Sequence, residues 1–374
     1  MNTHLQLAGT LRAAEKQVSA KRVVAGFDAF VDQIVQIVGE RQSLEHFSPV
    51  PTIADFAGLI ARAAGRSSLR EFVVQSLDPG GCAVNLGDGI ASLGVGLDFF
   101  GTLGHPAHPA FTDFSAKCHS CTPWAIDPGF TMAMEFQDGK YMLSSVSSLT
   151  DFTPNALRAC LTDGTFQQAC TEAELIALTN WTLFPHMTDC WRVLQEEVFS
   201  RLPNRPWFFL DLVDPRSRGE SEIRAMLPVL SRFEDCGRCV LGGNLNEANV
   251  LATLLGLETV QEEGPAIADL CEALRFKLGI SEVAIHCIAG AAVAAEDGRI
   301  WVNGPYTPRP RKSTGAGDRY NAGYCLGRLL DLPPQERCLT GSAASGFFVR
   351  NARSATLAEA ARLLEDWASD RLQD

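Results

Sequence analysis

The sequence predicts an α/β fold in which helices cover both faces of a mostly parallel β-sheet. Apolar, β-rich runs alternate with helical patterns along most of the chain. Strands that are joined through helices pair in parallel and are covered on both faces. Two other stretches contain an Asp-Gly pair between β-like runs, which is the strongest short-range signal for a hairpin. We therefore expect a three-layer α/β/α domain with antiparallel additions, and ligands at the carboxyl ends of the parallel strands.

The expected elements follow one another with short connections. The parallel strands are expected at Val23–Phe27, Leu97–Gly101, Leu175–Trp181, Trp207–Val213, Cys239–Gly242 and Val283–Ile288. The hairpins are expected at Thr131–Leu143 and Ala291–Val302. No repeat, low-complexity tract or flexible linker divides the chain. We therefore expect residues 1–374 to form a single domain, with a small β lid contributed by parts of 33–79 and 123–149.

Composition and charge indicate a globular protein that binds a small molecule. Of the 374 residues, 46% are apolar and 20% are charged, which suffices for a sizeable core. A net charge of −12 argues against nucleic acid or an anionic membrane as partner, because both need a basic face. No apolar run reaches the roughly 20 residues of a bilayer span. The polar, amphipathic stretch Met1–Lys21 is not typical of a signal peptide, so we expect a cytoplasmic protein.

Twelve cysteines include two pairs with metal-like spacing, Cys118/Cys121 and Cys236/Cys239. A zinc site needs four ligands that meet tetrahedrally, yet the pairs lie far apart in the sequence. We favour thiols in a reducing compartment, where cysteine behaves as a small hydrophobe. Zinc binding is the alternative.

The stretch KSTGAGDRYNAG, residues 312–323, places glycines and one carboxylate where a helical pattern begins. A helix N-terminus exposes unpaired amide N–H groups and binds anions. Gly315, Ala316 and Gly317 would let a phosphoryl group approach that backbone, and Asp318 would accept a proton from an attacking hydroxyl. The glycines by themselves fit a tight turn equally well, with Asp318 only favouring the helix dipole.

Further motifs favour the phosphoryl interpretation. Pro79–Gly94 reads PGGCAVNLGDGIASLG, with two glycines, an asparagine four residues after the second, and a helix that ends in Leu-Gly. Together with TGAGD at 314–318, this stretch resembles the two signatures of the ribokinase/PfkB family of carbohydrate kinases. The element VVAGFDAFVD fits the family's first strand, which closes with an aspartate, here Asp32, and NLNE also fits the family in the same order. The resemblance extends over the chain from Val23 onward.

The resemblance implies a ribokinase-like fold and an ATP-dependent kinase that transfers the γ-phosphoryl group to a hydroxyl of a sugar or sugar-like molecule. It makes Asp318 the catalytic base. The implied anion hole is Gly315, Ala316 and Gly317. The implied substrate contacts are Asp32, Gly80, Gly81 and Asn85. A strand-end aspartate is also a common turn residue, and Asn85 in a helix can be satisfied locally.

The implied cofactors are ATP and Mg²⁺, and the resemblance leaves room for a monovalent cation such as K⁺. The implied cofactor-binding residues are Asn244, Glu247 and Thr314. No metal ligand is assigned directly, and Mg²⁺ is expected near Asn244 and Glu247. Helix capping by Asn244 is the simpler alternative. Relatives whose lid hairpins pair between subunits make a homodimer an expectation as well.

Two charges depart from the family pattern. Lys312 stands where the family has an aspartate, and Arg319 stands where a small residue is usual. Lys312 either reaches the ATP phosphates as a point charge or disturbs a cation site. A nucleoside kinase is the alternative among enzymes, since related pockets hold a ribose. A sugar-binding sensor without catalytic activity is the alternative from another class.

Overall fold

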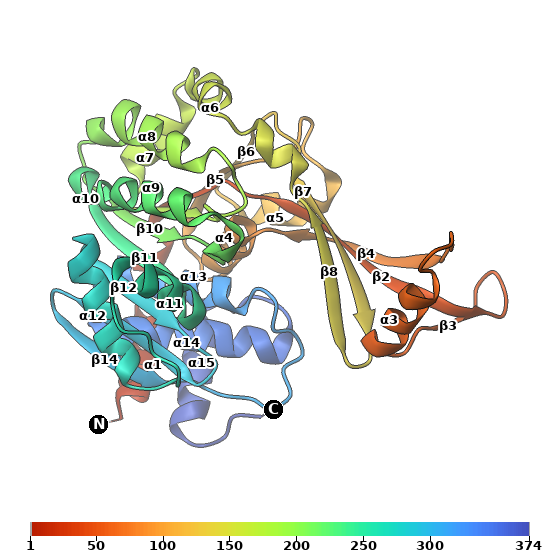
Figure 1. Ribbon diagram of the computed structural model, residues 1–374. Helices are drawn as coiled ribbons and strands as arrows, with labels where there is room; N and C mark the ends of the chain where they lie inside the picture. The colour runs from red at the N-terminus through yellow and green to blue at the C-terminus, as the bar shows by residue number, and fades with distance from the viewer. Residues whose placement is uncertain (1, 374) are drawn as a thin grey trace.

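The computed structural model describes residues 2–373, within which nine strands form one large sheet (Figure 1). Its strand order is β14-β13-β12-β11-β10-β9-β1-β5-β6. These strands are β1 (Arg22–Gly26), β5 (Gly96–Gly101), β6 (Ser120–Pro123), β9 (Leu175–Thr179), β10 (Trp207–Asp211), β11 (Arg238–Asn244), β12 (Glu282–His286), β13 (Gly290–Ala295) and β14 (Gly298–Asn303). Neighbouring strands pair in parallel along the spatial order β6-β5-β1-β9-β10-β11-β12. Strands β13 and β14 extend the sheet in the antiparallel direction.

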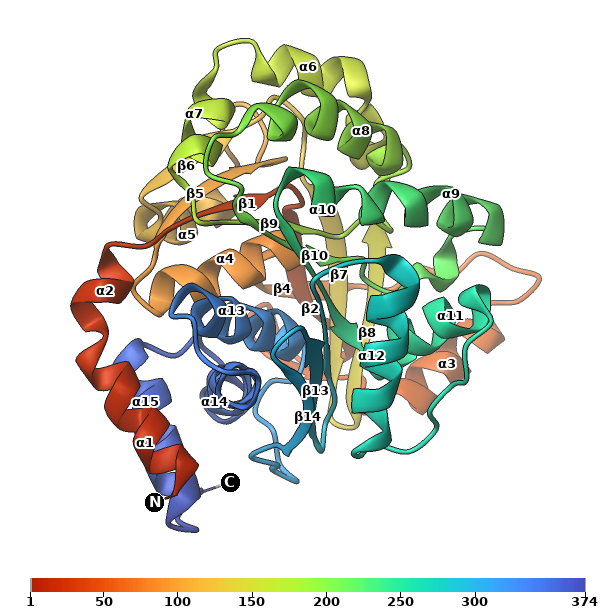
Figure 2. The same cartoon turned by 90° about the vertical axis from the view of Figure 1, so that its left-hand side faces the viewer.

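Alternate residues of these strands enter two different apolar cores, because successive side chains of a strand point to opposite faces. In β10, Phe208 and Leu210 pack into one core and Phe209 into the other. Helices cover both faces, so the sheet is the middle of three layers (Figure 2).

One face packs against helices from both ends of the chain. They are α1 (Thr3–Ala13), α2 (Glu15–Ser19), α4 (Cys82–Ser92), α5 (Thr112–Lys117), α13 (Ala316–Leu329), α14 (Pro334–Asn351) and α15 (Leu357–Ala368). The other face packs against α6 (Pro154–Leu161), α7 (Thr165–Glu172), α8 (Met187–Glu197), α9 (Glu220–Ser231), α10 (Phe233–Cys236), α11 (Leu245–Leu255) and α12 (Ala266–Leu278). The predicted three-layer fold is confirmed.

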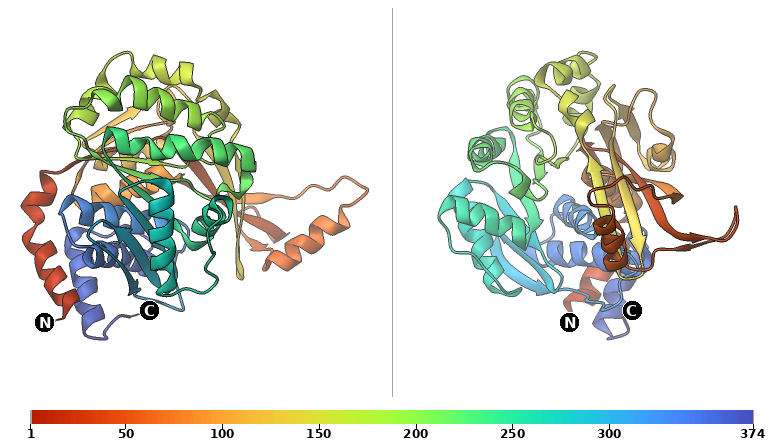
Figure 3. Two further views of the ribbon diagram at one scale, coloured as in Figure 1. Left: turned by 60° about the vertical axis from the view of Figure 1, so that its left-hand side comes forward. Right: turned by 45° about the vertical axis from the view of Figure 1, so that its right-hand side comes forward.

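A small second sheet projects from this body together with helix α3 (Ile53–Arg62) (Figure 3). It contains β2 (Phe30–Arg41), β3 (Phe47–Pro49), β4 (Phe72–Gly80), β7 (Gly129–Phe136) and β8 (Gly139–Ser145). Strand β2 pairs with β4 and β3 antiparallel and with β7 in parallel. This sheet comes from the two segments that the sequence analysis assigned to a lid.

The predicted strands and both hairpins are present, but the start of the chain differs from expectation in one respect. The first strand ends at Gly26, and the chain turns through residues 27–29 before β2 begins at Phe30. Asp32 therefore belongs to the small sheet and does not close the first strand of the large sheet. In the part of the chain that the structure describes, no helix is long and apolar enough to span a bilayer.

Candidate active site

Several polar side chains gather where the parallel strands of the large sheet end. Asp28 follows β1, Thr179 ends β9, Asp211 ends β10, Asn244 ends β11, and His286 ends β12. Parallel strands present their carboxyl ends at one edge of the sheet, so residues far apart in sequence meet there. Helices α4 and α13 begin beside this edge.

Asp28 fixes the glycine turn that leads into α4. Its fully buried carboxylate accepts the amide N–H groups of Cys82 and Ala83 at 2.7 and 2.8 Å. It also accepts the side-chain donors of Thr179 and Asn180 at 3.3 and 2.9 Å. Burial raises the pKa of Asp28, and these four donors counteract that shift. Sequence analysis missed Asp28, although an acid two residues after a strand-closing glycine was a usable signal.

Gly80 and Gly81 are required by two neighbouring carboxylates. A Cβ at Gly80 would collide with the carboxylate of Asp32. Gly81 has φ +99°, and a Cβ there would lie 2.9 Å from Oδ2 of Asp28. Because the two glycines have no Cβ, the backbone of the turn can lie in contact with the carboxylates of Asp32 and Asp28. Burial raises the pKa of Asp32, which a hydrogen bond with Thr131 counteracts.

Asp318 and Asn85 join the two helix starts. Asp318 lies in the first turn of α13, and its Oδ2 accepts Nδ2 of Asn85 at 3.0 Å. Burial raises the pKa of Asp318 to about 7, and the negative charges of Asp211 and Asp28 add to the rise. Arg319 and the hydrogen bond from Asn85 act in the opposite direction. Such a carboxylate is poised to take a proton near neutral pH.

The N-terminus of α13 offers free amides beside Asp318. Gly315 caps the helix with φ +85°. The amide of Ala316 donates to the carbonyl of Ser313 at 3.0 Å, so it is already engaged. Among residues 2–373, no acceptor contacts the amides of Gly317 and Asp318. Of the three residues of the expected anion hole, Gly315 and Gly317 thus have amides without an acceptor among residues 2–373, whereas the amide of Ala316 is engaged.

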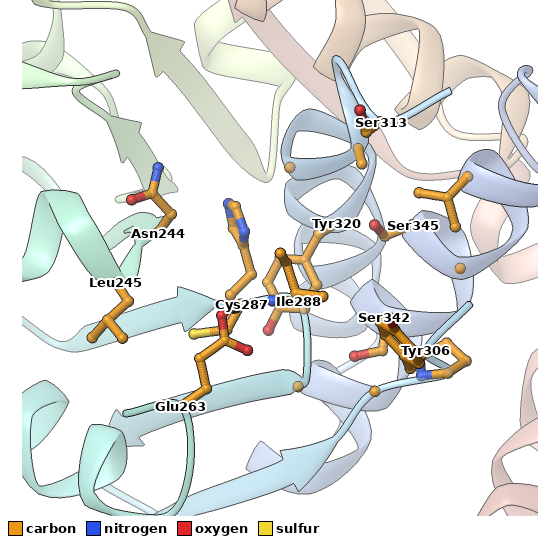
Figure 4. A pocket seen from close by; sticks show the side chains of 18 of the residues that line it. Asn244, Leu245, Glu263, Cys287, Ile288, Tyr306, Ser313, Tyr320, Ser342 and Ser345 are labelled. Atoms are coloured by element: carbon orange, nitrogen blue, oxygen red, sulfur yellow. Dashed lines mark hydrogen bonds between the residues drawn. The ribbon is translucent and has the colours of Figure 1, made fainter. Parts of the chain in front are cut away.

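A cavity of about 540 Å³ opens next to this helix end (Figure 4). Asn244 and Leu245 line one side, and Tyr320, Ser342 and Ser345 line the opposite side. Apolar and small polar side chains in such a cleft are typical of a site for an organic ligand. The cavity touches Ala316 and Gly317, so a phosphate chain extending from it would reach the free amides.

His286 contributes to this cavity and was not assigned from the sequence. A Cβ at Gly317 would lie 2.8 Å from Cε1 and 2.9 Å from Nε2 of His286, so the imidazole occupies the space beside Gly317. The ring also packs on Tyr320, with 5.2 Å between the ring centroids. Burial lowers the pKa of His286 to about 4, so the ring is neutral at pH 7. Its position at the end of a sheet strand was the available signal.

Acidic side chains surround Asp318 without forming a complete metal site. Burial raises the pKa of Glu247 to about 8, and the charge of Asp211 adds to the rise. Oε2 of Glu247 accepts the amide of Asn244 at 2.9 Å, and Oδ1 of Asn244 accepts the amide of Glu247 at 3.1 Å. The predicted cap is thus present. No group of three or more His, Cys, Asp or Glu side chains within residues 2–373 is arranged to hold a metal ion.

Arg319 and Lys312, the two charges that depart from the family pattern, lie in different surroundings. Arg319 is buried, contacts Asp88 at 3.2 Å and lies over the ring of Phe348, so it fastens α13 to α4. Lys312 is exposed and lines a cleft between the small sheet and the loop before α13, together with Thr314. Its charge lowers the pKa of Asp32. Lys312 therefore faces the Asp32 side of the site, and Thr314 lies outside the main cavity.

The sequence model of prokaryotic ketohexokinase matches residues 2–367 of this chain. The chain belongs to the prokaryotic ketohexokinase family. A ketohexokinase of Haloferax volcanii is 31% identical over 362 residues, which are 94% of this chain and 94% of that protein. As a member of this family the protein is a sugar kinase, a phosphotransferase with an alcohol group as acceptor. The predicted carbohydrate kinase is confirmed, and the nucleoside kinase and the inactive sensor are not favoured.

Comparison with solved structures shows that this chain has a ribokinase-like fold. The ribokinase of Arabidopsis thaliana in complex with ribose and ATP is similar with a TM-score of 0.64 and 17% identity, over 92% of this chain and 98% of that chain. The ribokinase of Thermotoga maritima gives a TM-score of 0.63 and 13% identity, over 92% and 98% of the two chains.

Proposed function

We propose that the protein is an ATP-dependent ketohexose kinase in which Asp318 activates the sugar hydroxyl. One observation carries this proposal: the carboxylate of Asp318 lies in the first turn of α13, beside the free amides of that turn, and accepts a hydrogen bond from Asn85 at 3.0 Å. The name of the relatives gives the substrate class, a six-carbon ketose such as fructose.

Asp32 and Asn85 would hold the sugar above the glycine turn. A carboxylate accepts hydrogen bonds from hydroxyls, while an amide both donates and accepts. Gly80 and Gly81 leave room for the carboxylates of Asp32 and Asp28, and the backbone of this turn is the proposed further contact of the sugar. The small sheet, which carries Asp32, would act as a lid that excludes water from the reacting phosphoryl group.

The reaction would proceed by a single in-line transfer. Asp318 takes the proton of the sugar hydroxyl as its oxygen attacks the γ-phosphorus, and the bond to the bridging oxygen of ATP breaks. The amides of Gly317 and Asp318 stabilise charge on the phosphoryl oxygens. The cavity beside His286 would hold the rest of the nucleotide.

Mg²⁺ would neutralise charge on the phosphates when it is bound. The charge of Asp211 raises the pKa of Glu247, and a cation bound nearby would offset this repulsion. Because Mg²⁺ keeps several waters and commonly binds one or two carboxylates plus phosphate oxygens, a complete protein cage is not required. Asn244, Glu247 and Thr314 remain the proposed cofactor contacts, and K⁺ stays a prediction.

The small sheet also supports the predicted homodimer. It exposes large apolar side chains, namely Phe72, Val74, Leu77, Phe130, Tyr141, Met142 and Leu143. Exposed apolar patches of this kind mark contact surfaces. Sedimentation equilibrium of the purified protein measures this directly, and a monomer at all concentrations would contradict it.

Substrate and chemistry can be tested in one set of assays. With ATP and Mg²⁺, ADP release is measured for ketohexoses, aldohexoses, pentoses and nucleosides, and the phosphorylated product is identified by mass spectrometry. We expect the highest kcat/KM with a ketohexose. A clear preference for a nucleoside would overturn the proposed substrate class.

The variant Asp318→Asn tests the role of the base. We expect kcat to fall about 10²- to 10⁴-fold, the range for loss of a general base. Thermal stabilisation by the sugar should persist, since Asn retains the shape of the side chain. The exposed carboxylate of Asp113, changed to Asn, is the control. Retained turnover in Asp318→Asn would refute the assignment.

A further inference from the structure

Cys118 and Cys121 form a thiol pair at an edge of the large sheet, outside the proposed kinase site. Cys118 directly follows α5, and Cys121 lies in the edge strand β6. The chain bends between them, and both sulfur atoms lie against the end of α5, Cys118 at the carbonyl of Phe114 and Cys121 at the hydroxyl of Ser115. Both residues are partly exposed to solvent.

The surroundings distinguish the two sulfur atoms. Oγ of Ser115 donates a hydrogen bond to Sγ of Cys121 at 3.3 Å. Sγ of Cys118 lies 3.4 Å from the carbonyl oxygen of Phe114 and donates to it. A sulfur that accepts hydrogen bonds is stabilised as a thiolate, whereas a donating thiol keeps its proton. The neighbouring Cys118 and the hydroxyl of Ser115 lower the pKa of Cys121, whereas the pKa of Cys118 is raised by Cys121 and by burial.

The other pair with the same spacing offers an internal comparison. Cys236 and Cys239 are both buried, and burial raises the pKa of each. A thiolate is the reactive form of cysteine, so a buried thiol of raised pKa is inert. Identical spacing thus occurs in one partly exposed pair and one buried pair, and the difference lies in the tertiary environment.

We propose that Cys118 and Cys121 are a reversible redox pair that reacts with low-molecular-weight disulfides. The Cys121 thiolate attacks one sulfur of the disulfide, whose S–S bond breaks and releases one thiolate. Cys118 loses its proton to that leaving thiolate or to water and attacks the mixed disulfide at Cys121. The second thiol leaves as the Cys118–Cys121 disulfide forms. In sum, two protein thiols are oxidised and one external disulfide is reduced to two thiols.

Equilibration of the full-length protein with defined ratios of reduced and oxidised glutathione tests the pair. After alkylation of free thiols, mass spectrometry of tryptic peptide 118–140, which contains both cysteines, reports the oxidised fraction. We expect an internal disulfide with a single two-electron transition, while Cys236 and Cys239 stay fully alkylated after denaturation. Failure of the disulfide to form at the most oxidising ratio would overturn the proposal.

Single variants test the order of the two steps. In Cys118→Ser, Cys121 should accumulate the mixed disulfide with glutathione. In Cys121→Ser, Cys118 should react at least about tenfold more slowly at pH 7, because reactivity follows the thiolate fraction. Equal rates at the two positions would contradict the assigned roles. Both readouts are chemical, so they are independent of the proposed kinase substrate.

Discussion

The sugar side and the nucleotide side of the proposed site differ in how they are built. On the sugar side, Asp32 lies above Gly80, Asp28 holds the turn, and Asn85 bonds Asp318, so charged groups are already in place. On the nucleotide side, a cavity of about 540 Å³ is lined largely by small or neutral side chains, with a neutral His286 at its inner end.

This difference indicates how each ligand would be recognised. Hydroxyls need fixed donors and acceptors, which the sugar side provides through side chains that other residues hold in position. A nucleotide offers a flat base and a charged phosphate chain, so an open cleft next to free helix amides suffices. Substitutions should therefore affect the two KM values separately, except at the junction around Gly317 and Asp318.

The junction should be the most sensitive point. In Gly317→Ala the new Cβ would lie 2.8 Å from Cε1 of His286, so the imidazole or the helix end has to shift, and a shift of the helix end takes the two free amides out of alignment. We expect kcat to fall about 10²- to 10³-fold, as for loss of an oxyanion-type donor. Steady-state kinetics measure this effect. The double variant Gly317→Ala with His286→Ala relieves the contact and should recover part of the loss; no recovery would contradict the steric explanation.

Asp32→Ala should separate the two sides most clearly. It removes a carboxylate that would bind sugar hydroxyls, so the sugar KM should rise about 10- to 100-fold, equivalent to about one hydrogen bond to a charged group. The KM for ATP should change less than threefold, about 0.6 kcal/mol. Both constants come from varying one substrate at saturation of the other. Parallel increases in both KM values would show that the two sides are not independent.

The pH profile tests the charge state at the junction. Because the pKa of Asp318 is raised to about 7 and the base must be ionised, kcat/KM should fall about tenfold per pH unit below pH 7. Asn85 lowers the pKa of Asp318, so Asn85→Leu should move the descending limb to higher pH. Initial rates between pH 5 and 9 at fixed ionic strength give both profiles. A flat profile through pH 6 would exclude Asp318 as the titrating base.

The smallest effect is expected from His286→Ala. The imidazole lies beside Gly317 and faces the nucleotide cavity, so its loss should raise the KM for ATP about three- to tenfold. The sugar KM should stay unchanged. His108→Ala, which removes a histidine that caps a turn between β5 and α5, is the control. A change confined to the sugar KM would contradict the assignment of His286 to the nucleotide side.

The sequence by itself determined the layers of the fold and most of the sugar side. Alternation of apolar runs with helical patterns predicts which segments form the parallel strands. Short motifs predict Asp318, Asn85 and the glycine turn, because the residues within each motif lie close together in the chain. The sequence showed that Lys312 and Arg319 differ from the family pattern, but it did not show what either side chain contacts.

Only the tertiary structure decided the roles that depend on long-range neighbours. Arg319 is a structural contact because Asp88, which lies 231 residues earlier in the chain, accepts it. Asp28 and His286 enter the site because strand ends of the large sheet meet at one edge. Burial from distant segments also sets the pKa of Asp318 and distinguishes Cys118/Cys121 from Cys236/Cys239. Local spacing encodes a turn or a helix start, whereas burial and charge come from residues that only folding brings together.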